Sequence, residues 1–235
     1  MKSLFLAFVL AAISGCGTIN ATLSDSQGRE VMLLGHDPVS YFTDGKPQRG
    51  DPAIATTHQG RTYYFASEAH RRAFLAAPAG YEPQYGGFCS NGMAYGVKMS
   101  TDPTAWTIVD GRLFIFGDIL GYEQWKLDLR SNIATGDALW ASEAQDAGWR
   151  GQTIKRVIFR VPHYRTGPEL RARWEALNPG KRISYDPGGT IRNLFVKYPG
   201  WRAREGHSQP ALGFPGLDAC PPACAGEFTR GPEAP

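Results

Sequence analysis

Short apolar runs separated by turn residues dominate the chain between residues 31 and 116. Two pairs of these runs are each separated by two turn residues, Gln59-Gly60 in the first pair and Asp110-Gly111 in the second. Asp-Gly between β-type runs is a strong signal for a tight hairpin loop. The pattern therefore predicts two β-hairpins, formed by residues 54–58 with 61–65 and by residues 106–109 with 112–116.

Two further strands are predicted upstream, at residues 31–34 and 39–42. Both are apolar runs, and Asp37-Pro38 between them supplies turn residues. His36 follows Gly35 in this turn, so we expect it to be a capping or surface residue.

A short helix is predicted after Ser67, whose hydroxyl can accept a hydrogen bond from the first turn. His70, Phe74 and Ala77 then recur at helical spacing and share one face. We expect this face to be turned toward the core because Phe74 is the largest apolar side chain on it. Pro78 ends the helix.

Aromatic residues at helical spacing predict more helices downstream. Tyr122, Trp125 and Leu129 form one such pattern, and Leu139 and Trp140 indicate a following helix after Gly136. Pro168 opens a third pattern, whose apolar stripe consists of Leu170, Trp174 and Leu177. We expect the tryptophans to serve packing, because each buries a large area.

The amino terminus has the pattern of an export signal. Lys2 precedes an apolar run from Leu4 to Ile13 that is too short to span a bilayer. Ile13-Ser14-Gly15-Cys16 resembles the lipobox of bacterial lipoproteins, which implies cleavage before Cys16 and acylation of its sulfur. The alternative is an ordinary secretory peptide that contains a cysteine. In both cases the mature chain leaves the cytoplasm. Some lipoproteins carry an aspartate directly after the acylated cysteine, which retains them in the inner membrane. Gly17 stands at this position here, so the outer membrane is the expected destination.

Composition divides the rest of the chain. Residues 198–235 contain 7 Pro and 6 Gly, which predicts disorder. We therefore expect an α+β protein in which a small domain of two β-hairpins and short helices is followed by a small α/β extension and this tail. The expected boundaries are a signal peptide at 1–15, a tether at 16–30, the domain with its helical extension at 31–147, the basic extension at 148–197 and the tail at 198–235.

Charge is distributed unevenly. Residues 16–147 carry 10 Lys and Arg against 15 Asp and Glu, a net charge of −5, whereas residues 148–235 carry 14 against 7, a net charge of +7. The basic part could rest on anionic lipid headgroups, or it could be a solvated face. Nucleic acid is not expected as a partner outside the cytoplasm.

Three cysteines remain once Cys16 is assigned to lipid: Cys89, Cys220 and Cys224. An odd number in an oxidising compartment leaves one thiol over. One division pairs Cys220 with Cys224 and leaves Cys89 reduced. The other joins Cys89 to a tail cysteine.

Three motifs in order resemble the YHS-domain family, in particular its secreted bacterial branch. They are GHDPVSYF at residues 35–42, TYYFASEAHRRAFLAAPAGYEPQYGGFC at 62–89 and DPTAWTIVDGRLFI at 102–115. The family is found beside heavy-metal transporting ATPases, and the resemblance implies a small α+β domain with a metal-binding role. Members that bind metal in zinc-finger fashion carry paired cysteines, whereas this domain contains Cys89 alone.

The leading hypothesis is that Cys89 and His70 bind a soft or borderline metal, with Met93, Met99 or His36 completing the shell. Thiolate and imidazole suit Cu(I) or Zn(II), and thioether adds a preference for copper. Zinc requires four ligands, whereas Cu(I) accepts two or three, so copper fits these residues better.

Three alternatives accompany this hypothesis. His70 and Cys89 could be structural groups of the interior. The thiol and the imidazole could be a nucleophile and its base, although the sequence identifies no third residue to orient the base, so an enzyme is not expected. The domain could also be a metal-free binding module with an aromatic groove formed by Tyr81, Tyr85 and Phe88.

Overall fold

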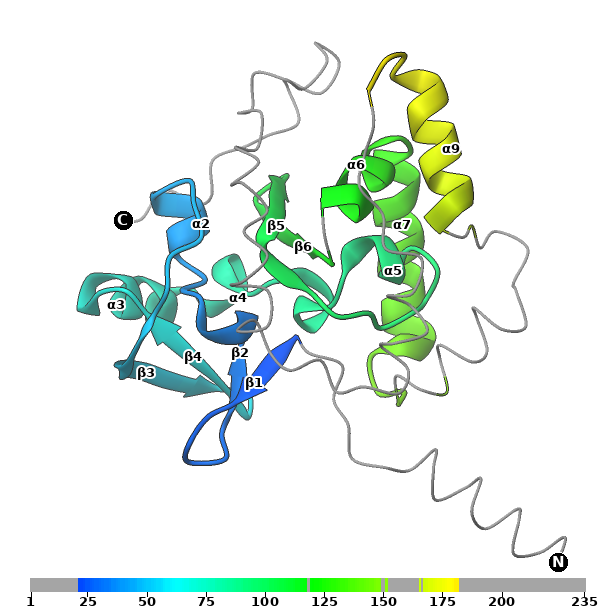
Figure 1. Ribbon diagram of the computed structural model, residues 1–235. Coiled ribbons are helices and arrows are strands. Elements are labelled where there is room, and N and C mark those ends of the chain that lie inside the picture. Colours follow the sequence, from blue (N-terminus) through cyan, green and yellow to red (C-terminus); the bar gives the residue numbers. More distant parts are fainter. Residues whose placement is uncertain (1–20, 118, 149–150, 152–164, 166, 182–235) are drawn as a thin grey trace, which may run out of the picture.

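Two separate β-sheets and a series of short helices make up the fold (Figure 1). The structure is a computed structural model, and it describes residues 21–117, 119–148, 151, 165 and 167–181. Mixed helices and strands in this arrangement confirm the predicted α+β class. Several predictions lie outside the described residues: the signal peptide, Cys16, the remainder of the basic extension, the tail, Cys220 and Cys224.

The first sheet contains four strands in the order β1-β2-β4-β3. These are β1 (Thr22–Ser24), β2 (Glu30–Met32), β3 (Asp51–His58) and β4 (Arg61–Phe65). The β3–β4 hairpin turns at Gln59 and Gly60, which both have positive φ, at 48° and 74°. Two left-handed residues match the twist of the flanking strands, so this hairpin is confirmed as predicted.

The second sheet is the hairpin of β5 (Asp102–Val109) and β6 (Arg112–Phe116). Its turn residues Asp110 and Gly111 also have positive φ, at 50° and 70°. Residues 106–109 pair with 112–115 in register, which confirms the second predicted hairpin.

Six short helices lie between the strands, the first two between β2 and β3 of the first sheet and the other four between the two sheets. They are η1 (Leu33–Gly35), α2 (Ser40–Thr43), α3 (Glu68–Ala76), α4 (Pro78–Tyr81), η2 (Gln84–Gly87) and α5 (Ser90–Met93). The Ser67 hydroxyl accepts a hydrogen bond from the His70 N–H at 3.1 Å, which confirms the predicted cap of α3. Pro78 follows the end of α3 and occupies the first turn of α4, where its missing N–H costs nothing.

The remaining helices cover the second sheet. They are α6 (Ile119–Lys126), α7 (Leu129–Leu139), the π-helical turn η3 (Trp140–Ala144) and α9 (Gly167–Leu177). The prediction of a new helix after Gly136 was wrong, because Gly136 lies inside α7 against the ring of Tyr85. Leu170 and Trp174 are buried, and the Trp174 indole donates to Glu123 of α6, so α9 packs on the domain; Leu177 is 60% exposed.

Three segments differ from prediction. Residues 39–42 are not a strand: Val39 precedes α2, because the Asp37 carboxylate accepts from the Val39 N–H and turns the chain into a helix. The strand expected at 31–34 ends at Met32, since Leu33 and Leu34 both have φ of 52°. Residues 22–24, which fall within the expected tether, form β1.

The interior is divided between the two sheets. Val39, Phe65 and Phe74 belong to a cluster beneath the first sheet, whereas Phe114, Phe116 and Trp125 belong to a larger cluster between the β5–β6 hairpin and the helices that follow it. A third, smaller cluster contains Tyr41, Leu113 and Ile115. Trp125 is fully buried, as expected for packing. The described part of the chain contains no helix long and apolar enough to cross a membrane.

Candidate functional site

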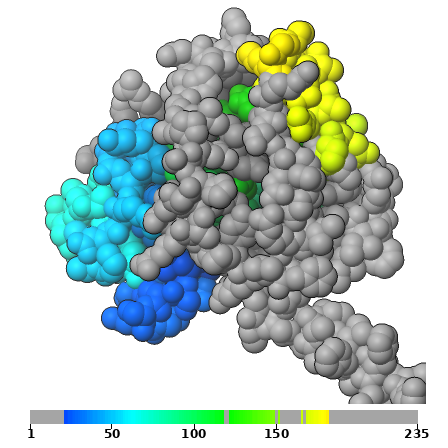
Figure 2. Space-filling view, in the orientation of Figure 1, coloured from blue at the N-terminus to red at the C-terminus, as the bar shows by residue number. Residues whose placement is uncertain are grey.

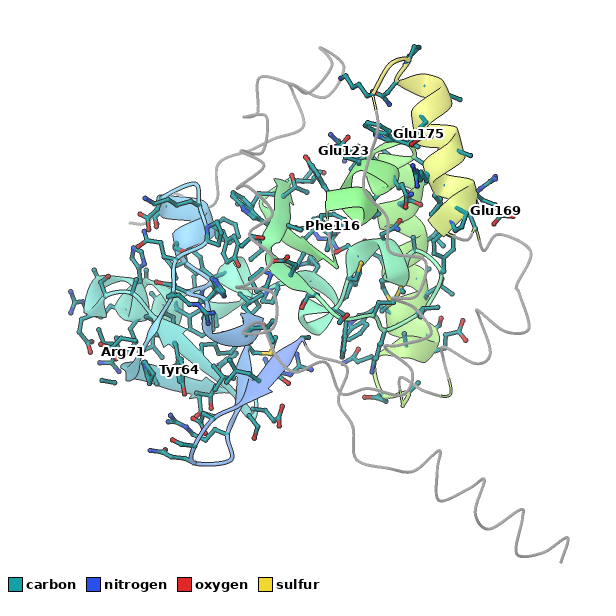
Figure 3. All side chains as sticks on the ribbon, viewed as in Figure 1. Tyr64, Arg71, Phe116, Glu123, Glu169 and Glu175 are labelled. Carbon is teal, nitrogen blue, oxygen red and sulfur yellow. The ribbon has the colours of Figure 1, made fainter. Side chains whose placement is uncertain are left out.

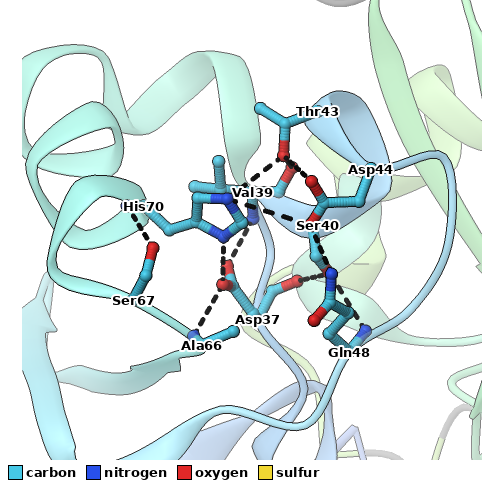
Figure 4. Close-up of polar contacts among 9 residues, drawn as sticks. All are labelled: Asp37, Val39, Ser40, Thr43, Asp44, Gln48, Ala66, Ser67 and His70. Atoms are coloured by element: carbon cyan, nitrogen blue, oxygen red, sulfur yellow. Dashed lines mark hydrogen bonds and ion pairs between the residues drawn. The ribbon is translucent and has the colours of Figure 1, made fainter.

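A buried carboxylate organises the turn that follows β2. Asp37 is fully buried, and its two oxygens each accept a backbone hydrogen bond of 2.8 Å, Oδ1 from Val39 and Oδ2 from Ala66 (Figure 4). The first bond sets the start of α2 and the second joins the turn to the end of β4. Such donors are what a buried carboxylate requires.

The His70 imidazole completes the surroundings of this carboxylate. Its Nδ1 lies 2.6 Å from Asp37 Oδ2, and the imidazole side chain is 17% exposed. A carboxylate acceptor at this distance favours the tautomer with the proton on Nδ1, which leaves the Nε2 lone pair for another group. His70 is thus half-buried and paired, rather than packed with Phe74 as predicted.

Side chains of α2 and the following loop surround the outer edge of the ring. Nε2 lies 3.4 Å from Thr43 Oγ1 and 3.8 Å from Asp44 Oδ2. Gln48 anchors Asp44 through a 2.6 Å hydrogen bond, and the Gln48 N–H donates to Ser40 Oγ. We call these six residues the Asp37 network: Asp37, Ser40, Thr43, Asp44, Gln48 and His70.

Cys89 lies in the other half of the structure, immediately before α5. It is 5% exposed and belongs to the cluster that contains Phe116 and Trp125, and the structure contains it as a thiol outside any disulfide. Its N–H donates to Met99 O at 3.1 Å, and its carbonyl accepts from the Met93 N–H at 2.9 Å. The backbone of Cys89 therefore connects directly to both methionines that were predicted as ligands.

The methionine side chains lie in the same region. Met93 is fully buried in the cluster of Cys89, and Met99 packs against that cluster. A Cβ on Gly92 would lie 2.8 Å from Met99 Cγ and 3.0 Å from its Sδ, so the thioether occupies space that only glycine leaves open. We call Cys89, Met93 and Met99 the sulfur cluster.

The predicted juxtaposition of His70 and Cys89 is not found. Figure 1 shows α3 at one edge of the molecule and α5 beyond the β5–β6 hairpin, and Figure 3 shows the same separation between Arg71, next to His70 in the chain, and Phe116, in the cluster of Cys89. Both ring nitrogens of His70 face the Asp37 network. Within the described ranges, no group of three or more His, Cys, Asp or Glu side chains is arranged to hold a metal ion.

His36 is the C-cap residue of η1, which agrees with the predicted capping role, but it is buried rather than at the surface. It is 4% exposed, and its Nδ1 lies 3.0 Å from Leu33 O. Burial, reinforced by the positive charge of Arg49, lowers the pKa of His36 to about 4. His36 is therefore neutral at pH 7, and it lies in the turn before α2, away from the sulfur cluster in the chain.

The expected aromatic groove is also not formed as predicted. Tyr81 and Tyr85 are buried at 3% and 4% exposure, and Phe88 is half-buried. The Tyr85 hydroxyl donates to Asp137 of α7 at 3.0 Å. These rings are packing residues of the interior.

Two buried polar atoms near the sulfur cluster have no hydrogen-bond partner among the described residues. They are Ser90 Oγ, directly after Cys89, and Trp125 Nε1, in the same apolar cluster as Cys89. Buried polar groups are nearly always satisfied, so these two atoms distinguish the surroundings of Cys89 from the Asp37 network.

Sequence reasoning missed the role of Asp37. The Asp-Pro dipeptide was recognised as a turn, but the hydrogen bond from Asp37 to His70 joins residues 33 positions apart. An aspartate that caps its own turn is a local signal that could have identified the start of α2. No family model, no curated protein and no solved structure matches this chain.

Proposed function

We propose that this chain is an exported, lipid-anchored protein of the YHS type, which binds Cu(I) in the cell envelope through the sulfur cluster. The observation that carries the proposal is that Cys89 and Met93 are buried in one apolar cluster and that Met99 packs against this cluster. Thiolate and thioether are soft donors, and they select Cu(I) over the harder divalent ions.

The donor set favours copper over zinc. Zinc in a structural site takes four ligands in a tetrahedron, whereas the sulfur cluster offers three. His70, which was expected to contribute a nitrogen, pairs with Asp37 instead. The thioethers of Met93 and Met99 also favour Cu(I) over Zn(II), because they are soft donors.

Titration of the purified chain with Cu(I) under anaerobic conditions, against a competing chelator, tests this proposal. We expect wild type to bind Cu(I), Cys89→Ser to lose binding, and Met99→Leu to bind more weakly. His70→Ala should bind as wild type does, because His70 lies outside the sulfur cluster. Met32→Leu is the matched control, since Met32 is a buried methionine of the other apolar cluster.

A metal-free packing role for Cys89 is the second candidate. It is favoured by the apolar surroundings of the thiol, which is 5% exposed among aromatic side chains. Equal copper retention by wild type and Cys89→Ser would decide for this role. The domain would then be an exported binding or structural module.

A further inference from the structure

The Asp37–His70 pair continues to a third side chain. Nδ1 of His70 lies 2.6 Å from the Asp37 carboxylate, and Nε2, on the other edge of the ring, lies 3.4 Å from the Thr43 hydroxyl (Figure 4). A carboxylate, an imidazole and a hydroxyl in this order are the arrangement of hydrolytic triads, which are recognised by geometry rather than by sequence position. Contacts between nucleophile and base are often this long without substrate.

The carboxylate is held rigidly, as the orienting member of a triad must be. Asp37 is fully buried, and the backbone N–H groups of Val39 and Ala66 fix its two oxygens. Its orientation therefore sets the plane of the His70 ring and keeps the proton on Nδ1. Nε2 is left as the base that faces Thr43 at 3.4 Å. The Thr43 hydroxyl also has Val39 O and Asp44 Oδ1 as acceptors, each at 3.2 Å, so it has to rotate toward Nε2 to give up its proton.

The nucleophile is accessible, whereas the carboxylate is not. Thr43 and Asp44 are exposed, at the end of α2 and just after it. Figure 2 shows the blue and cyan segments that carry α2 and α3 along one edge of the molecule. A substrate can thus reach the hydroxyl while water is kept from Asp37.

We propose that Thr43, His70 and Asp37 form a hydrolytic site for carboxylic esters. Thr43 Oγ bonds to the ester carbonyl carbon while its proton passes to His70 Nε2. The ester C–O bond breaks, and the alcohol leaves with that proton. Water then attacks the acyl-threonine and gives its proton to Nε2, which returns it to Thr43 Oγ as the carboxylic acid is released. Asp37 is the positioning residue.

The neighbouring charge defines the substrate class. Asp44 places Oδ1 3.2 Å from Thr43 Oγ1 and Oδ2 3.8 Å from His70 Nε2. A carboxylate this close repels anionic substrates, so the site takes neutral or cationic esters.

Hydrolysis of p-nitrophenyl acetate by the purified full chain tests the site. We expect saturable turnover by wild type, and a loss of about 100-fold or more in Thr43→Ala and in His70→Gln. Asp37→Asn should lower kcat much more than it raises KM, at a temperature where circular dichroism shows it folded. Thr104→Ala is the matched control, because Thr104 is an exposed threonine bonded to Asp102 at 2.7 Å; it should keep the wild-type rate.

A second readout keeps the test independent of folding. Acid quench during turnover should trap an acetyl group on Thr43, detected by peptide mass spectrometry. The proposal is overturned if Thr43→Ala hydrolyses the ester as fast as Thr104→Ala, or if the acetyl group is found on another residue. Neither outcome bears on copper binding, which concerns Cys89.

Discussion

The Asp37 network and the surroundings of the sulfur cluster differ in whether their buried polar atoms are hydrogen bonded. Around Asp37 the buried carboxylate and the Ser40 hydroxyl are hydrogen bonded within the fold. Around Cys89 the Ser90 hydroxyl and the Trp125 indole have no partner in the described chain. The buried polar groups of the first region are thus satisfied by the fold itself, whereas these two in the second region are not satisfied by the described chain.

Loss of the Asp37 carboxylate should have the largest effect on stability. Asp37→Ala leaves the Val39 and Ala66 N–H groups and the His70 imidazole without their acceptor, so we expect the free energy of unfolding to fall by about 3–5 kcal/mol. Urea denaturation measures it. The control is Arg130→Ala, which removes an ion pair to Asp110 whose side chains are 58% and 51% exposed and should cost less than about 1 kcal/mol. Equal losses would show that the network is not a principal support of the fold.

Acidification should weaken the same half of the molecule through His36. The pKa of His36 is about 4 in the folded chain and 6.5 in the unfolded chain. Between pH 4 and pH 6.5 the unfolded chain therefore binds a proton at His36, whereas the folded chain does not. The free energy of unfolding should therefore fall as pH drops from 6.5 to 4, by about 3 kcal/mol from this group. Urea denaturation across this range should show a shallower slope for His36→Leu than for wild type. Parallel slopes would mean that His36 is hydrated.

Two buried serines, one in each region, allow the most direct comparison, although the expected changes in the free energy of unfolding are the smallest. Ser40 and Ser90 are both fully buried and both begin four-residue helices. Ser40→Ala breaks hydrogen bonds with Asp37 O and the Gln48 N–H and should cost about 1–3 kcal/mol. Ser90→Ala breaks no bond among the described residues, so its free energy of unfolding should stay within about 0.5 kcal/mol of wild type. A matching loss in both variants would reveal a partner for the Ser90 hydroxyl and remove the contrast.

Local signals predicted the elements that depend on local chemistry. Gln59-Gly60 and Asp110-Gly111 have the left-handed backbone that tight hairpins require, and Ser67 caps α3. These features are determined by neighbouring residues, so one stretch of sequence contains the information. The strand expected at 39–42 failed for a related reason, because the run is apolar but the Asp37 side chain starts a helix there.

The candidate site depends on contacts that no local pattern contains. Cys89 was expected to fold back on His70, but Tyr85 and Gly86, with φ of 56° and 60°, bend the chain away from α3. The Tyr85 hydroxyl then bonds to Asp137, 52 residues later, which holds this bend against α7. The pairing of Asp37 with His70 spans 33 residues and is equally invisible in the sequence. Cys89, Met93 and Met99 are close together in the sequence, and the structure joins them through main-chain hydrogen bonds, while their role as ligands stays a prediction.

The early start of β1 matters for the proposed lipid anchor. Ala21 is 2% exposed and β1 begins at the next residue, so four residues lie between Cys16 and the first described residue. The five Cα–Cα steps from Cys16 to Ala21 span at most about 18 Å even when fully extended. With Cys16 acylated as proposed, the domain is held within a headgroup's reach of the bilayer, and its cargo or substrate has to arrive at the membrane surface.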